Sequence, residues 1–193
     1  LLMDYILTVA VSVSSGIAQI VSAYPNLFQY RIYLAVGAAL LIMLVNLRGV
    51  KESGTLFAVP TYFFLLMMVT TVGIGLIRYF TGSLGTVIDP PELHITNTIA
   101  AITPFLLLHA FANGTTALTG VEAISNGITA FSEPRSRNAG ITLIWMSLIL
   151  GSLFLGISYL ISHIGAVFSE EETIISQMAR TVFNGRGLPY IAL

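Results

Sequence analysis

Residues 141–167, ITLIWMSLILGSLFLGISYLISHIGAV, decide the fold class because this run contains no Asp, Glu, Lys or Arg. An α-helix rises about 1.5 Å per residue, and the hydrocarbon core of a bilayer is about 30 Å thick. The run is therefore long enough to cross a membrane as one helix. A helix that is apolar on all sides also needs apolar surroundings. We predict a transmembrane helix here.

The whole chain has the same apolar character. Of its 193 residues, 55% are hydrophobic and 9% are charged, whereas an ordinary soluble domain has about 25% charged residues. The net charge of -1 gives no indication of a nucleic-acid partner, and the absence of cysteine excludes disulfides and thiolate metal sites. The predicted fold class is an all-α polytopic membrane helix bundle, with the lipid bilayer as its partner.

Further apolar runs predict the other crossings. Spans are expected at residues 3–23, 30–47, 55–80, 98–131 and 141–167, with the start of a further span at residue 188. The polar segments 48–54, 81–97 and 132–140 are predicted loops, and a short amphipathic helix is predicted at about residues 174–183. Pro60 and Pro104 are expected to kink their helices. Both chain ends fall in apolar sequence, so we expect residues 1–193 to be one transmembrane-domain fragment of a longer protein.

The span at 98–131 is too long, and too rich in Gly and Thr, for one regular helix. Residues 113–122 read NGTTALTGVE, and glycines at membrane depth weaken a helix. We predict a discontinuous helix that is broken near Gly120, with unwound backbone carbonyls available to a cation. Close helix packing is the alternative explanation for the glycines, but it does not account for Glu122.

Two acids, Asp4 and Glu122, fall inside predicted spans. An ionisable side chain at membrane depth costs several kcal/mol unless a partner or a cavity compensates. Thr8, Ser12 and Ser15 continue from Asp4 at helical spacing, which makes one polar stripe of oxygens suited to a hard cation such as K⁺ or Na⁺. Alternatively, Asp4 lies near the interface, and the hydroxyls bond to their own helix.

Thr119 lies three residues before Glu122 and adds a second oxygen beside the predicted break. The candidate substrate or ion site is therefore Asp4, Thr8, Ser12, Thr119 and Glu122. Of these residues, Glu122 and Asp4 can also carry a proton.

Three stretches then carry a family resemblance. They are residues 4–12 (DYILTVAVS), 47–54 (LRGVKESG) and 117–127 (ALTGVEAISNG), the last followed by FSEP at 131–134. They resemble the amino acid–polyamine–organocation (APC) superfamily, and within it the bacterial proton-coupled potassium importers of the KUP type. The resemblance covers the whole chain. It implies the third to seventh membrane helices and the start of the eighth in a LeuT-like fold of two inverted repeats.

The resemblance also implies a multi-pass location in the plasma membrane of a bacterium. It implies K⁺ ligands at Asp4, Thr8 and Thr119, with K⁺ and H⁺ as transported ligands and no resident cofactor. Basic residues in the loops are evenly divided between the two sides, so they do not orient the chain. The resemblance places Arg48 and Lys51, with Arg135 and Arg137, in the cytoplasm.

The preferred hypothesis is a secondary transporter that takes up K⁺ by proton-coupled alternating access. The alternative is a proton-coupled amino-acid permease of the same superfamily, because such permeases share the glycine-and-acid break. The chain has no HExxH or GxSxG motif, so we do not expect an enzyme. Either a small cation or an amino acid is thus the expected substrate, and the sequence leaves a homodimer open.

Overall fold

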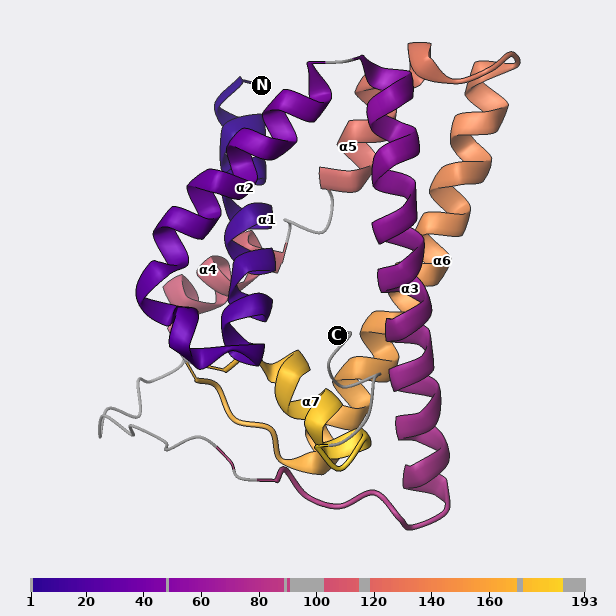
Figure 1. Cartoon of the computed structure of the whole chain (residues 1–193). Coiled ribbons are helices and arrows are strands. Elements are labelled where there is room, and N and C mark those ends of the chain that lie inside the picture. Colours follow the sequence, from indigo (N-terminus) through magenta and orange to yellow (C-terminus); the bar gives the residue numbers. More distant parts are fainter. Residues whose placement is uncertain are drawn as a thin grey trace. The chain divides into compact units, whose positions relative to one another are not determined.

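The computed structural model describes residues 2–47, 49–88, 90, 103–114, 119–169 and 172–185, and this described part contains helices and no strand (Figure 1). The all-α fold class is thereby confirmed. In chain order the α-helices and 3₁₀ helices (η) are α1 Leu2–Ala23, η1 Pro25–Tyr30, α2 Arg31–Asn46, α3 Val50–Phe80, α4 Pro104–Gly114, α5 Thr119–Asn126, η3 Ile128–Ala130, α6 Arg135–Ile164 and α7 Ile174–Val182.

Four helical segments of the described part are long and apolar enough to cross a membrane. They are Tyr5–Ala23, Pro25–Asn46, Gly54–Phe80 and Arg135–Ile164. Most of their side chains are exposed, including large apolar ones such as Leu41, Leu148 and Phe154. In water such faces would associate, whereas a bilayer solvates them. These segments contain most of the residues of four predicted spans, and their passage through a bilayer stays a prediction.

The helices extend further into polar sequence than predicted. α3 begins at Val50 and α6 begins at Arg135, so most of the predicted loops 48–54 and 132–140 is helical. Hydropathy marks only the part of a helix that crosses hydrocarbon, and backbone hydrogen bonds continue to form beyond it. The turn before α3 instead needs Gly49, whose φ of 119° strongly favours glycine.

The described part of the segment predicted as a discontinuous span contains α4, α5 and η3. α4 ends at Gly114 and α5 begins at Thr119, while residues 98–102 and 115–118 lie outside the described part. Gly120 is inside α5. Because residues 115–118 are outside the described part, the break near Gly120 stays a prediction.

The two prolines behave differently from each other. Pro60 lies inside α3. Pro104 is the first residue of α4, where its missing N–H costs no hydrogen bond, so the prediction that it kinks a helix is wrong. The predicted span start at residue 188 lies outside the described residues.

The chain forms two compact units. One unit comprises residues 1–93 and 153–193, and contains α1, α2, α3, α7 and the last part of α6. The other comprises residues 94–152, and contains α4, α5 and the first part of α6.

The core of the first unit lies where α3, the end of α6 and α7 meet. Met68, Leu160, Ile164 and Met178 are almost completely buried there. Glycine allows the close approach of α3 and α6, because a Cβ atom at Gly156 would lie 2.5 Å from Val72 Cγ1. Small residues have this function in many membrane helix contacts.

Replacing Gly156 by Val is expected to destabilise the protein. Val72 is β-branched and has little rotamer freedom in a helix, so α3 and α6 must separate to admit the new side chain. Overpacking of this kind costs about 1–3 kcal/mol, which should lower the thermal unfolding midpoint of the full-length protein in detergent by several degrees.

The matched control is Gly37→Val in α2, because a Cβ atom at Gly37 meets nothing within 4 Å. Equal unfolding midpoints for the two variants would contradict a tight contact at Gly156.

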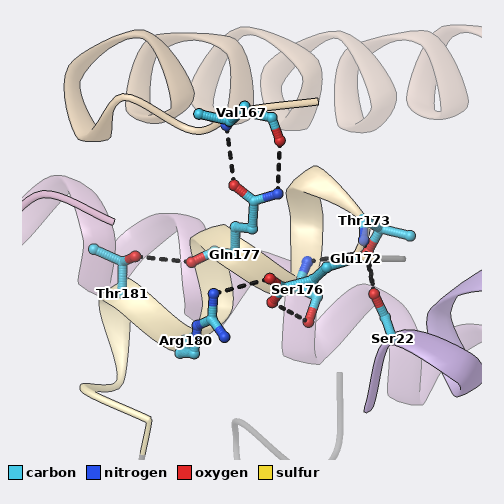
Figure 2. A network of polar contacts seen from close by, with 8 residues as sticks. All are labelled: Ser22, Val167, Glu172, Thr173, Ser176, Gln177, Arg180 and Thr181. Carbon is cyan, nitrogen blue, oxygen red and sulfur yellow. Dashed lines mark hydrogen bonds and ion pairs between the residues drawn. The ribbon is translucent and has the colours of Figure 1, made fainter. Parts of the chain in front are cut away.

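Helix α7, predicted at about residues 174–183, is observed at Ile174–Val182. Its N-terminal end is hydrogen-bonded to α1 (Figure 2). The Thr173 hydroxyl accepts a hydrogen bond from the Ser176 backbone N–H at 3.2 Å, which caps the helix. The same hydroxyl donates to Gln19 Oε1 at 2.8 Å, and the Thr173 backbone N–H donates to Ser22 Oγ at 2.7 Å. The start of α7 is therefore fastened to the end of α1.

The middle of α7 is fixed by the buried Gln177 and by an ion pair of the half-buried Arg180 and Glu172 (Figure 2). Gln177 accepts a hydrogen bond from the backbone N–H of Val167 at 3.0 Å and donates to its carbonyl oxygen at 2.7 Å. Arg180 forms an ion pair with Glu172 at 2.8 Å. A buried amide satisfied on both sides gives a packed segment a single defined position.

The C-terminal end of α7 is capped by Arg78 of α3. Its guanidinium donates to the carbonyl oxygens of Thr181 and Val182 and to Oδ1 of Asn184. A cation is favourable here because the last carbonyls of a helix are unpaired and carry partial negative charge. α7 thus connects α1 to α3 in the first unit.

Candidate ion-binding site

The first group of predicted site residues lies on α1. This helix runs unbroken from Leu2 to Ala23, so Asp4, Thr8 and Ser12 follow one another at intervals of four residues along one side. Successive positions are about 6 Å apart along the axis. Thr8 is half-buried and Ser12 is exposed, while the side chain of Asp4 lies outside the described part. The helix therefore presents a row of positions that a cation can contact in sequence.

The second group lies on the short helix α5. Thr119 is its first residue, and the Thr119 side chain lies outside the described part. Glu122 falls in the first turn and is half-buried. Its Oε1 atom accepts a hydrogen bond from Asn126 Nδ2 at 3.4 Å.

Close packing on α6 sets the position of α5 within the second unit. A Cβ atom at Gly120 would lie 3.1 Å from Met146 Cε, so the glycine allows the first turn of α5 to approach α6. At the other end, the N–H of Gly127 bonds to the carbonyl oxygen of Ala123 at 2.9 Å, and a Cβ atom there would collide with that oxygen. Gly120 therefore has a packing role, which is the alternative explanation for the glycines, whereas a Cβ atom at Gly114 would meet nothing within 4 Å.

The two groups of site residues belong to different units. Asp4, Thr8 and Ser12 are in the first unit, and Thr119 and Glu122 are in the second. Their convergence on one ion stays a prediction.

Some polar contacts in the described part were not predicted from the sequence. One set is the network of hydrogen bonds around α7. Within it, only Thr173 could be recognised from the sequence, because a Thr directly before an amphipathic run is a typical helix N-cap. Another is the Glu122–Asn126 hydrogen bond, which the spacing of four residues on a helix permits. The hydrogen bonds of Gln177 could not be predicted from the sequence, because its partner is a backbone group of another segment.

The first unit also contains a cavity of about 600 Å³. It lies between α1, the start of α2, and Phe168, Ser169 and Thr173. Its walls are mainly apolar, with Ile17, Val21 and Val36 among them, and Arg31 contributes a cation.

Similarity to known proteins identifies the family of this chain. The sequence profile described as "Amino acid permease" matches residues 1–191. The chain belongs to the amino acid permease family. This family is part of the APC superfamily, so the resemblance noted from the three stretches is confirmed. Membership of a permease family also accounts for the apolar helices of the described part.

A curated relative within the superfamily is "Potassium transporter KimA" of Bacillus subtilis (strain 168). It is 45% identical over 195 residues, an alignment that covers 100% of this permease chain and 31% of the relative. The chain thus spans about a third of the length of that relative. Both the family and the relative are membrane transporters rather than enzymes.

Proposed function

We propose that the complete protein imports K⁺ across the cytoplasmic membrane of a bacterium. The observation that carries the proposal is the 45% identity to a potassium transporter, which extends over every residue of this chain. The alignment covers both helices that carry the candidate site residues.

The chemistry of the candidate site supports a cation as substrate. Asp4, Thr8 and Thr119 would supply carboxylate and hydroxyl oxygens, the ligands that hard cations prefer. K⁺ must lose much of its hydration shell to bind, and a negative charge in low-dielectric surroundings offsets that cost far more strongly than in water. Ser12 would extend the row of oxygens along α1 and serve as a further position on the path.

Proton coupling is the second part of the proposal. Glu122 would accept a proton on the outer side and release it on the inner side, so that its charge changes within each transport cycle. Binding of H⁺ at Glu122 and of K⁺ at neighbouring oxygens would be thermodynamically linked, and uptake requires that both ions be carried inward in the same cycle.

An amino-acid substrate is the second candidate function. It is favoured by the match of residues 1–191 to a profile described as an amino acid permease. An amino acid would need a site for its carboxylate, and in this superfamily a break in the first helix provides that site. Asp4 and Glu122 would repel the substrate carboxylate unless they are protonated.

Transport by the purified full-length protein in liposomes separates the two candidates. We expect K⁺ uptake that increases several-fold when an inward proton gradient is imposed, and no accumulation of labelled amino acids under the same gradient. The complete gene should also restore growth at low potassium to a bacterium that lacks its own potassium importers. Amino-acid uptake without K⁺ uptake would refute the proposal.

A further inference from the structure

The cavity of the first unit has the features of a binding site for an amphiphile. Its volume is about 600 Å³, and it is a half-open cavity lined by helix α1, the first turns of α2, and Phe168, Ser169 and Thr173. Apolar side chains form most of its wall, including Ile17, Val21 and Phe168. A small hydrophilic solute would leave these walls without favourable contacts, whereas a hydrocarbon chain removes them from water.

Arg31 is the cation at this cavity. Its guanidinium lies over the ring of Phe28, with Cζ 4.5 Å from the ring centroid, and Phe28 also lines the cavity. In the described part of the chain, no Asp or Glu forms an ion pair with Arg31. A guanidinium that stacks on a ring with its face keeps its N–H edges available for a bidentate anion such as a phosphate.

Exposed tyrosines place Arg31 at the level of lipid headgroups. Tyr24, Tyr30 and Tyr33 have exposed fractions of 57%, 50% and 77%, and all three lie within seven positions of Arg31. Tyrosine side chains concentrate where a membrane helix leaves the hydrocarbon, because the ring is apolar and the hydroxyl is polar. In contrast, Val36 lies further along α2, in the direction of the hydrocarbon, and also lines the cavity.

From this combination we infer that the cavity binds an anionic phospholipid. The phosphate pairs with Arg31, and the first part of an acyl chain fills the space between α1 and α2. From the headgroup level inward, a phospholipid has its phosphate first and its acyl chain second. In the same direction the cavity has Arg31 first and apolar side chains second. Cationic residues beside clefts between membrane helices bind acidic lipid headgroups in this manner.

The cavity also adjoins the attachment of α7. Thr173 lines the cavity, and its hydroxyl and backbone N–H form the hydrogen bonds to Gln19 and Ser22 that fasten α7 to α1. A lipid in the cavity would therefore contact the residue at which two elements of the first unit are joined. We expect lipid binding to raise the thermal stability of the protein, since a ligand that binds only the folded state stabilises it.

Native mass spectrometry of the full-length protein tests the inference, with phosphatidylglycerol and phosphatidylcholine offered at equal concentration. We expect the wild type to retain phosphatidylglycerol at least about fivefold more than phosphatidylcholine, and Arg31→Gln to remove this preference. The control is Arg135→Gln, because Arg135 is exposed and pairs with the exposed Glu133. Equal retention of phosphatidylglycerol by the wild type and Arg31→Gln would overturn the assignment.

A second variant tests the acyl-chain part without removing a charge. Ala18 lines the cavity, so Ala18→Phe should fill it and reduce retention of phosphatidylglycerol while Arg31 is intact. Glycerol 3-phosphate, which carries the phosphate without acyl chains, should not displace the bound lipid. Unchanged retention in Ala18→Phe, or complete displacement by glycerol 3-phosphate, would show that the apolar walls do not hold a lipid. A normal elution volume on size-exclusion chromatography verifies folding of each variant.

Discussion

Replacing Asp4 by Asn is expected to reduce K⁺ uptake by the full-length protein at least about 100-fold. Asn keeps the size of Asp and one carbonyl oxygen but removes the negative charge. At 4 Å and an effective dielectric constant of about 20, one unit charge interacts with another by about 4 kcal/mol. A factor of ten corresponds to about 1.4 kcal/mol, so even part of this energy gives a 100-fold loss. The measurement is the initial rate of K⁺ uptake into liposomes.

The control is Asp89→Asn, since Asp89 is the other aspartate of the chain and falls in the predicted loop 81–97. The same chemical change there should leave uptake within about twofold of the wild type. Uptake unchanged in Asp4→Asn would remove Asp4 from the site, although the proposal of K⁺ transport would remain.

Replacing Glu122 by Gln is expected to uncouple transport from the proton gradient. Gln has the size of Glu and can still contact Asn126, but it cannot bind and release a proton at physiological pH. Uptake driven by an inward proton gradient should fall at least about tenfold, to the rate seen without the gradient. Proton entry that accompanies K⁺ uptake, followed with a pH-sensitive dye inside the liposomes, should disappear.

Glu133→Gln is the matched control for this second prediction, because Glu133 lies in the same unit and forms an exposed ion pair with Arg135 at 3.2 Å. Exposed pairs of this kind contribute about 1 kcal/mol or less to stability. Proton-driven K⁺ uptake by Glu133→Gln should therefore resemble that of the wild type. Persistent coupling in Glu122→Gln would transfer the role of proton carrier to Asp4.

Helix boundaries show where reading the sequence was less accurate. α3 and α6 begin at Val50 and Arg135, several residues before the apolar runs that predicted them. The sequence pattern follows the change from hydrocarbon to interface, whereas a helix ends where its backbone loses hydrogen-bond partners or meets a residue such as Gly49. At Ala23 the end of the apolar run and the end of α1 coincide, because Pro25 follows closely.

The candidate site was predicted as residue types and spacings. Asp4, Thr8 and Ser12 could be assigned to one side of a helix because four residues is close to one helical turn. The glycines and threonines that interrupt the apolar run predict a break near Gly120, and residues 115–118, where α4 and α5 would separate, are outside the described part. The contact of Gly120 with Met146 could not be predicted, since the two residues are brought together only by the packing of α5 on α6.

The sequence by itself determined the class of protein, because the choice between water and a bilayer depends on composition and on the length of apolar runs. It also determined the family, because the characteristic stretches are local. Only the tertiary structure decided that Gln177 bonds to Val167, that Arg78 caps α7, and that Arg31 lies beside an apolar cavity. Each of these features joins residues from different segments. Such contacts depend on shape and packing between helices, which no periodicity within one helix records.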